Sequence, residues 1–443
     1  MPTLARLARL ISSSFDKPFL PWRSSTMSFD TQAEAGPSSR RSPSLRPAAP
    51  APDAPSLPTI SPVVELSSLG PPGVPIHAKP SSWDFYRDTL GSPKYIVAPM
   101  VSASELPWRL LSREFGADLC YSPMINSRSL SDCLNAKSRG SREKQLAWYD
   151  VDHGEEGHGK DSMVIAQLAG HDPDVILQCA EYVQDHCLAV DLNLGCPQRI
   201  AKRGKYGAFL QEDWPLIFLI INKLHVNLKI PVTAKMRVFS DTETTVAYAK
   251  MLQYAGAQII TVHGRTREQK GHKTGLADWE KIRAVKEALD VPVFANGNIL
   301  YGEDLAEALH KTGADGIMSA EGNLFTPTIF SSLQLRKRYG TDLFPYLEDA
   351  DHPEWAALPY IPRMANMYLD TVVECNTRTS PVAVKGHMFK ICKPALDKYR
   401  DLMIMIGQAQ IKKGDWSTKE KREQAIAPYR LAVKAIEERL EVS

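Results

Sequence analysis

Short apolar runs and amphipathic stretches alternate along the chain from Tyr95 onward. Each short run is rich in β-branched and other apolar residues, which is typical of a strand that is buried on both faces. Eight such runs predict strands at Tyr95–Ala98, Asp118–Ser122, Met163–Gln167, Ala189–Asn193, Val232–Met236, Gln258–Val262, Val293–Ala295 and Gly316–Ser319. Strands that alternate with helices indicate a parallel α/β sheet, and eight in series predict a closed (β/α)8 TIM barrel.

The stretches between these runs have the apolar spacing of helices. They predict helices at Glu105–Phe115, Pro173–His186, Trp214–Val226, Thr242–Ala255, Trp279–Ala288 and Glu303–Lys311. A doubly wound sheet is the alternative fold, but it has fewer strands and a glycine fingerprint after the first one. Here the first strand ends in Ala98-Pro99-Met100, which favours the barrel.

Three segments of different composition predict the domain limits. Twelve prolines lie between Gly36 and Pro80, a composition that cannot bury a core, so we expect residues 1–83 to be a disordered Pro/Ser-rich extension. Residues 84–342 form the predicted barrel. Residues 343–443 have helical patterning without strands and predict a smaller all-helical domain.

The start of the chain resembles a transit peptide. Arg6 and Arg9 precede any acidic residue, and the leucines around them have helical spacing. We expect a protein of the cytoplasm, the nucleus or both, and a mitochondrial form is the alternative. No apolar run approaches the 18 residues that a membrane-spanning helix needs, so we expect no membrane partner.

The seven cysteines and the histidines give no metal-ligand spacing. The insert Ser131–Lys160 contains His153 and His158 beside carboxylates, but a solvated surface loop explains it better than a metal site does. We therefore predict no metal, a reducing compartment and, by default, a monomer.

One cysteine lies where a barrel enzyme keeps its reactive groups. Cys196 follows the fourth strand in a glycine-rich loop, and Lys202, Arg203 and Lys205 come directly after it. Active sites of barrels are built at the C-terminal ends of the strands. A thiol beside cations indicates chemistry on a polyanion, while a buried structural cysteine before an exposed basic turn is the alternative.

Polar residues follow the other predicted strands as well, and together they predict a ring of polar groups at one face of the barrel. The strand ends offer Pro99, Met100, Val101, Gln167, Asn193, Lys235, Arg237, His263, Gly264, Arg265, Asn296, Gly297, Asn298, Ala320, Glu321, Gly322 and Asn323.

The last two strand ends favour a phosphorylated cofactor. Both are glycine turns that lead into helices, where backbone N–H groups often bind phosphate. Lys235 and His263 are predicted to face the barrel mouth as cations that stabilise a negative charge on a cofactor ring. Reduced flavin is such an anion; pyridoxal phosphate with a lysine Schiff base is the alternative.

Several long motifs resemble the flavin-dependent tRNA-dihydrouridine synthases, in particular their eukaryotic branch that acts on positions 16 and 17 of the D loop. The motifs are APMV at Ala98–Val101, SELPWRLLSREFGADLCYSPM at Ser104–Met124, QLAGHDP from Gln167, DLNLGCPQRIAKRGKYGAFL at Asp191–Leu210, KMRVF at Lys235–Phe239, TVHGRTREQKG at Thr261–Gly271, PVFANGNI at Pro292–Ile299 and MSAEGNL at Met318–Leu324.

The resemblance implies that FMN is the cofactor, that NADPH is the reductant and that tRNA is the substrate. It implies FMN contacts from Pro99, Met100, Val101, Gln167, Lys235, His263, Asn296, Gly297, Asn298, Ala320, Glu321 and Gly322, and it implies that Cys196 is the proton donor.

Two departures from the family pattern concern RNA contacts. Ser102-Ala103 stands where the branch often has a DQ pair, which puts substrate contacts of the first loop in doubt. In the helical domain, VKGHMFK at Val384–Lys390 looks like the RNA-binding motif of the branch, with Lys385 where arginine is common.

The expected reaction is a two-electron reduction of the C5=C6 bond of a uracil. A hydride added at C6 leaves an enolate, and a thiol that is mostly protonated at neutral pH, here that of Cys196, can protonate C5. The target base must first leave its stack. The predicted substrate and RNA contacts are Asn193, Lys202, Arg203, Lys205, Arg237, Arg265, Arg267, Lys385, His387 and Lys390.

Two other functions stay open at this point. A flavin barrel that acts on a free pyrimidine explains the strand ends but leaves the basic helical segment without a role. That segment, from Pro381 to Ser443, carries thirteen Lys and Arg against eight Asp and Glu. A non-catalytic RNA-binding protein that has kept the fold is the other alternative.

Overall fold

A computed structural model of the chain describes residues 63–136, 149, 161, 163–271, 274–332, 360–377, 379–411 and 417–441. The predicted N-terminal targeting segment, the histidines of the insert and the predicted boundary at residue 343 lie outside the described residues.

The described strands form one parallel sheet that closes on itself. They are β1 Tyr95–Val97, β2 Leu119–Tyr121, β3 Ile125–Asn126, β4 Val164–Ala169, β5 Ala189–Leu194, β6 Val232–Arg237, β7 Ile259–His263, β8 Val293–Asn296 and β9 Gly316–Ser319. The order β2-β1-β9-β8-β7-β6-β5-β4 is closed by pairing of β2 with β4, and the two-residue β3 adds to β4. The TIM barrel predicted from the sequence is confirmed, and each of its eight predicted strands is present.

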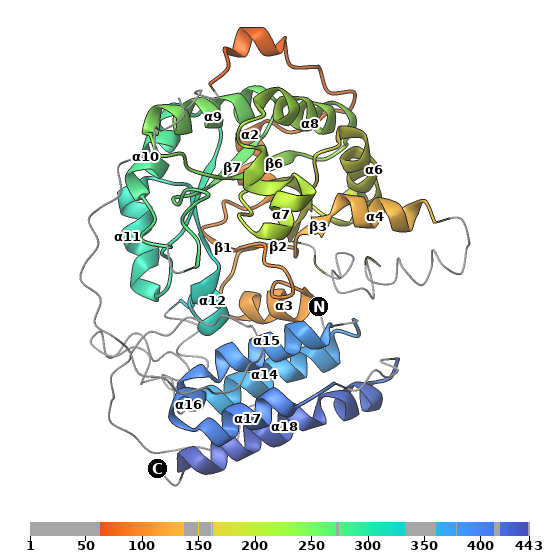
Figure 1. The fold of residues 1–443 in the computed structure, drawn as a ribbon, viewed down its shortest axis with the longest axis vertical. Coiled ribbons are helices and arrows are strands. Elements are labelled where there is room, and N and C mark those ends of the chain that lie inside the picture. The colour runs from red at the N-terminus through yellow and green to blue at the C-terminus, as the bar shows by residue number, and fades with distance from the viewer. Residues whose placement is uncertain are drawn as a thin grey trace, which may run out of the picture.

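Helices surround the barrel and then continue as a separate layer (Figure 1). Around the barrel lie α3 Leu106–Glu114, α4 Ser127–Leu134, α6 Pro173–Val183, α7 Arg199–Gly204, α8 Trp214–Asn227, α9 Thr242–Tyr254, α10 Trp279–Ala288, α11 Gly302–Thr312 and α12 Glu321–Phe325. The later helices are α14 Ile361–Glu374, α15 Pro381–Ile391, α16 Lys393–Lys398, α17 Arg400–Gln408 and α18 Lys419–Glu441. The short helices α4 and α7 were not predicted, because neither has a long apolar stripe. None of the described helices is both long and apolar enough to span a membrane.

Side chains inside the barrel change from apolar to polar along the strands. At the N-terminal ends, Phe294 and Met318 pack on Phe85 and Tyr86 of the one-turn helix η2 (Phe85–Thr89), which directly follows α2 (Ser82–Asp84) and closes this end. On β5, Val190, Leu192 and Leu194 belong to the apolar layer under the helices, so Asp191 and Asn193 point to the interior. The polar interior therefore lies at the C-terminal ends of the strands.

The predicted start of the folded region at residue 84 is too late. The segment 63–81 packs along α8 and α9, and Figure 1 shows it at the opposite end of the molecule from the later helices. The backbone N–H of Ile76 donates to the carbonyl of Val226 at 3.0 Å, and Gln258 Nε2 donates to the carbonyl of Pro80 at 2.7 Å. A proline-rich composition predicts little regular structure, but it does not prevent an extended segment from pairing its backbone with a neighbouring surface.

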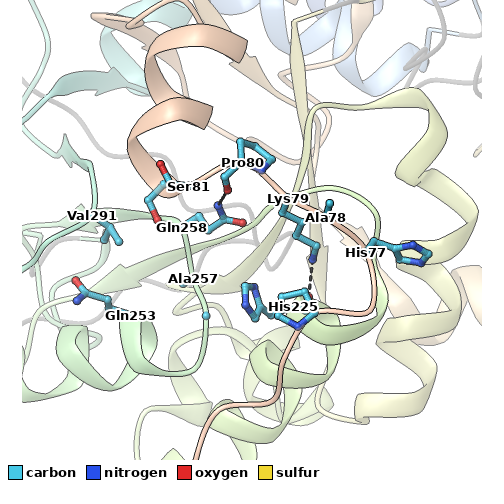
Figure 2. A pocket seen from close by; sticks show the side chains of 13 residues that line it. His77, Ala78, Lys79, Pro80, Ser81, His225, Gln253, Ala257, Gln258 and Val291 are labelled. Atoms are coloured by element: carbon cyan, nitrogen blue, oxygen red, sulfur yellow. Dashed lines mark hydrogen bonds between the residues drawn. The ribbon is translucent and has the colours of Figure 1, made fainter.

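This segment also walls an open cavity of about 590 Å³ at the N-terminal ends of the strands (Figure 2). Lys79 points toward α8 and donates to the carbonyl of His225. Burial, with the nearby charge of Lys79, lowers the pKa of His225 to about 4. The cavity lies at the end of the barrel opposite to Cys196.

The helical layer is joined to the barrel through α3. Glu105, directly before α3, is fully buried, and its carboxylate accepts a hydrogen bond from Tyr368 Oη of α14 at 2.9 Å. His387 Nε2 of α15 lies 3.2 Å from the other oxygen, and its ring stacks on Trp108 with 3.9 Å between centroids. Burial alone would raise the pKa of Glu105, but the charge and hydrogen bond of His387 hold it below its usual range.

The RNA contact predicted for His387 is therefore wrong for this structure. The side chain is 1 % exposed, so it cannot reach a ligand at the surface. In the motif VKGHMFK it has a docking role, and its partners Glu105 and Trp108 come from the motif SELPW, more than 270 residues earlier.

We predict that removing residues 63–81 destabilises the barrel. A chain that starts at residue 82 should melt a few degrees below one that starts at residue 63, because it loses backbone hydrogen bonds and the packing of Leu66 and Leu69. Thermal unfolding followed by circular dichroism measures the difference. Equal melting temperatures would contradict the packing of this segment.

We also predict that His387→Ala lowers the free energy of unfolding by about 3 kcal/mol or more, because it leaves the buried carboxylate of Glu105 without its imidazole partner. Lys393→Ala is the control, since it breaks an exposed ion pair with Asp397 and should cost about 1 kcal/mol or less. Urea unfolding measures both variants. Normal stability of the His387 variant together with weakened RNA binding would instead support a surface role.

Candidate active site

The loop that carries Cys196 begins on a cap made by Asn193. Asn193 Oδ1, at the end of β5, accepts hydrogen bonds from the backbone N–H groups of Gly195 at 3.1 Å and Cys196 at 3.0 Å. The thiol is partly exposed at the mouth of the barrel. Its predicted position at the C-terminal end of a strand is thus where the structure has it.

The glycine after the basic turn is required by close packing against the cysteine. Gly207 has a φ of +66°, and a Cβ at this position would lie 2.7 Å from the carbonyl oxygen of Cys196. The N–H of Ala208 donates to that same oxygen at 3.1 Å. The chain therefore folds back on Cys196, and only glycine permits this approach.

Three cations, one at the end of β6 and two in the loop after β7, donate hydrogen bonds to the segment around Cys196. Arg237 Nε donates to the carbonyl of Gly195 at 2.7 Å, Lys270 Nζ donates to that of Pro197 at 2.7 Å, and Arg267 Nη1 donates to that of Ala208 at 3.3 Å. Arg237 is buried, and burial lowers its pKa to about 10. In this structure Arg237 and Arg267 therefore bond to the protein backbone, and the RNA contacts predicted for them stay predictions.

Cations that remain accessible lie on α7. Lys202, Arg203 and Lys205 are exposed within ten residues of Cys196, and Lys205 ends the helix with a φ of +52°. This position next to the thiol agrees with the prediction of a basic surface at the mouth.

Lys235 lies in the polar interior beside the end of β8. Its Nζ donates to Asn296 Oδ1 at 3.0 Å, and Asn296 Nδ2 donates in turn to the carbonyl of Met318 at 2.8 Å. Burial and the nearby charge of Arg237 lower the pKa of Lys235 to about 8. The ammonium group is therefore held in place, but little of its positive charge is neutralised by protein groups, which suits a site for an anion.

The surroundings of His263 favour its neutral form over the cation that its residue type suggested. Burial and the charges of Lys235, Arg237 and Arg265 hold its pKa well below the usual range. Arg265 Nη1 lies 3.3 Å from His263 Nε2. A guanidinium can only donate, so Nε2 accepts and the proton is on Nδ1.

The two glycine turns after β8 and β9 pack against each other. Ser319 Oγ donates to the carbonyl of Ile299 at 2.9 Å, and a Cβ on Gly322 would lie 2.4 Å from that carbonyl. Gly297 and Asn298 both have positive φ, 108° and 59°. Ala320 and the exposed Glu321 complete the second turn.

The loop after β1 forms another side of the mouth. Met100 N donates to Ser104 Oγ at 3.0 Å, and the Met100 carbonyl accepts from the N–H of Ala103 at 3.2 Å. Pro99 and Met100 are partly buried, and Val101 is 62 % exposed. Ser102, where the predicted family pattern is broken, has a φ of +50°.

Two cations of α15 differ in their surroundings. Lys385 donates to the carbonyl of Gly407 within the helical layer. Burial lowers the pKa of Lys390, and the charges of Glu105 and Glu321 partly offset this effect. In Figure 1, α15 lies beside α12 and α3, on the side of the helical layer next to the barrel.

The interior carboxylate of Asp191 was not among the predicted site residues. It accepts from Gln167 Nε2 at 2.8 Å and from Thr233 Oγ1 at 2.7 Å. The sequence did contain a signal for Asp191. Asp191 and Asn193 are two positions apart in an otherwise apolar strand, so both side chains point to the same face.

Known proteins resemble the chain over most of its length. The profile of the dihydrouridine synthase family matches residues 96–413. A Saccharomyces cerevisiae protein named tRNA-dihydrouridine(16/17) synthase, with NAD(P)(+) in its name, is 43 % identical over 359 residues, 80 % of this chain and 78 % of its own. A Schizosaccharomyces pombe protein of the same name is 44 % identical over 330 residues, 73 % of this chain and 75 % of its own. A Mus musculus protein, named as similar to that enzyme, is 42 % identical over 325 residues, 73 % of this chain and 60 % of its own.

The matched region begins at the first barrel strand and extends through α17, so it includes every strand end described above. The chain belongs to the dihydrouridine synthase family, a family of oxidoreductases.

Proposed function

We propose that this protein reduces the C5=C6 bond of uridines at positions 16 and 17 in the D loop of tRNA, with FMN as cofactor and NADPH as reductant. The observation that carries the proposal is a thiol held at the barrel mouth beside a polar interior with excess positive charge. The names of the fungal relatives support the tRNA positions and the nicotinamide coenzyme.

The residues at the mouth suit an anionic flavin cofactor. Lys235 and Arg265 supply positive charge, His263 presents a neutral N–H donor, and the turn at Gly297 and Asn298 has the backbone conformation that exposes N–H groups to a phosphate. With Pro99, Met100, Val101, Asn296, Ala320, Glu321 and Gly322 they would hold FMN. Gln167 is fully buried under Asn193, and both ends of its amide already have partners.

Bound FMN would supply the hydride chemistry that connects NADPH as reductant with C6 of the uracil. The uracil is left as an enolate whose charge is shared with the C4 oxygen. Cys196 then donates its S–H proton to C5, which completes the addition of two hydrogens, and solvent returns a proton to the thiolate. Asn193 and the cation bonds keep the loop of Cys196 in place.

The substrate base has to leave its stack to enter the barrel. The exposed cations Lys202, Arg203 and Lys205 beside the thiol, together with Lys390 on the helical side, would hold the RNA backbone around the mouth. In this proposal the helical layer binds tRNA, and α3 fixes the position of that layer relative to the active site.

Products mapped on RNA test the function. Purified protein with NADPH should form dihydrouridine at D-loop positions 16 and 17 of a transcribed tRNA, and it should leave free uridine unchanged. Equal activity on free uridine would favour the small-molecule alternative, and dihydrouridine at other positions would overturn the assigned site.

We predict that Cys196→Ala affects one half-reaction. Reduction of the flavin by NADPH should keep its rate, while reoxidation of the reduced flavin by tRNA should slow by roughly 10²–10⁴-fold, the usual contribution of a positioned acid. Stopped-flow absorbance measures both steps. Cys133→Ala, in α4, serves as the control, and an unchanged rate of reoxidation in the Cys196 variant would remove the thiol from the mechanism.

We predict that FMN binding weakens as pH rises through about 8. The pKa of Lys235 is lowered to about 8, so its ammonium is charged below this pH and loses its charge above it. Titration of protein freed of flavin, followed by fluorescence between pH 7 and 9, should show the loss. Lys235→Met should bind FMN more weakly and without this pH dependence, and Lys202→Met should behave like the unmodified protein. A pH dependence that survives in Lys235→Met would mean that another group is responsible.

A further inference from the structure

A chain of side-chain amides connects a buried carboxylate to the backbone of Cys196. Gln167 Nε2 donates to Asp191 Oδ2 at 2.8 Å, and Asn193 Nδ2 donates to Gln167 Oε1 at 2.7 Å. Asn193 Oδ1 then accepts from the N–H groups of Gly195 and Cys196. Three neighbouring positions of the barrel interior, on β4 and β5, are thus joined in one line.

The polarity of this chain is determined by its two ends. Backbone N–H groups can only donate, so the oxygen of Asn193 must face Cys196 and its NH2 must face Gln167. The oxygen of Gln167 must then face Asn193, and its NH2 must face Asp191. An ionised carboxylate can only accept, so Asp191 is the one end group that agrees with this direction.

Little of this hydrogen-bonded chain is exposed to solvent. Asp191 and Gln167 are fully buried, and Asn193 is 9 % exposed. Burial raises the pKa of Asp191 to about 6, while hydrogen bonds from Gln167 and Thr233 and the charge of Lys235 favour its ionised form. If either side-chain amide were flipped, so that its oxygen and NH2 exchanged places, buried N–H groups would face each other. Such unpaired donors destabilise a protein interior that is shielded from water.

We propose that Asp191 is a positioning residue, which holds the Cys196 loop in its reactive position through Gln167 and Asn193. Asp191 touches neither substrate nor thiol and acts only by fixing the direction of two amides. The kinetic consequence rests on the proposed function, whereas the effect on the loop does not.

Substitutions at the middle of the chain test this directly. Gln167→Met has a similar shape but no polar atoms, so the amide of Asn193 loses its support. We expect alkylation of Cys196 by iodoacetamide, followed by peptide mass mapping, to become several-fold faster in the protein without tRNA or NADPH. Reoxidation of reduced flavin by tRNA should slow about tenfold, and reduction by NADPH, per bound flavin, should stay within twofold. Thr233→Val is the matched control. It removes the other hydrogen-bond partner of Asp191 and leaves the hydrogen bonds from Asp191 through Gln167 to Asn193 intact.

A change of polarity separates positioning from packing. In Gln167→Glu two carboxylates face each other and must share a proton to keep the chain connected. As pH rises and this proton is lost, alkylation of Cys196 relative to the unmodified protein should increase. Adding Asp191→Asn supplies an NH2 donor to Glu at position 167 and should abolish that increase. The same Asp191→Asn change should not rescue Gln167→Met.

Two results would overturn the proposal: a Gln167→Met protein that alkylates at the unmodified rate, or a double variant that keeps the pH-dependent increase of Gln167→Glu. If alkylation of Cys196 in Gln167→Glu does not increase with pH, the alkylation rate of Gln167→Met decides whether the proposal holds. A normal rate of flavin reoxidation by tRNA in Cys196→Ala would overturn only the acid role proposed for Cys196. Alkylation of Cys196 in the Gln167 variants would still report the position of its loop.

Discussion

Closure of the parallel sheet by the pairing of β2 with β4 is the constraint on which the site depends. In a closed parallel barrel all strand ends of one kind meet in a ring, so residues from β1 to β9, more than 200 positions apart in sequence, face one small space. Register then decides which of them are level with each other. Asn193 pairs with Lys235, Arg237 with His263, and His263 with Asn296, which builds a polar layer above the apolar plug made by Phe85 and Tyr86.

The polar layer has little freedom because its members satisfy one another. Lys235 is held by Asn296, His263 accepts from Arg265, and the Cys196 loop is bonded from below by Asn193 and from outside by Arg237. Hydrogen bonds between buried polar groups are strong at low dielectric, but they stabilise the protein only when each of these groups has a hydrogen-bond partner. Burial, and after it the positive charges of Lys235, Arg237 and Arg265, hold the pKa of His263 well below its usual range. An anionic cofactor would offset these positive charges.

Helix α3 connects the two parts of the molecule. Glu105, directly before this helix, accepts bonds from the helical layer. Trp108 stacks on His387, and its Nε1 donates to Asn323 of α12 at 2.7 Å. One helix therefore contacts α15 on one side and the glycine turn after β9 on the other. Any RNA bound across both parts would be placed relative to the barrel mouth by this buried contact.

The sequence by itself determined the barrel, its eight strands and the position of Cys196, because strand burial and strand ends leave local patterns of apolar residues and glycine. Patterns of this kind do not show what a polar side chain bonds to. His387 and Arg237 carry groups that suit RNA, yet tertiary contacts bury the first against Glu105 and commit the second to the carbonyl of Gly195. The lowered pKa of His263 depends on burial and on three nearby cations, and the role proposed for Asp191 depends on its hydrogen bond with Gln167 of the neighbouring strand. Only the tertiary structure decided these points, since hydrogen-bond direction and electrostatic environment arise between residues that are distant in sequence.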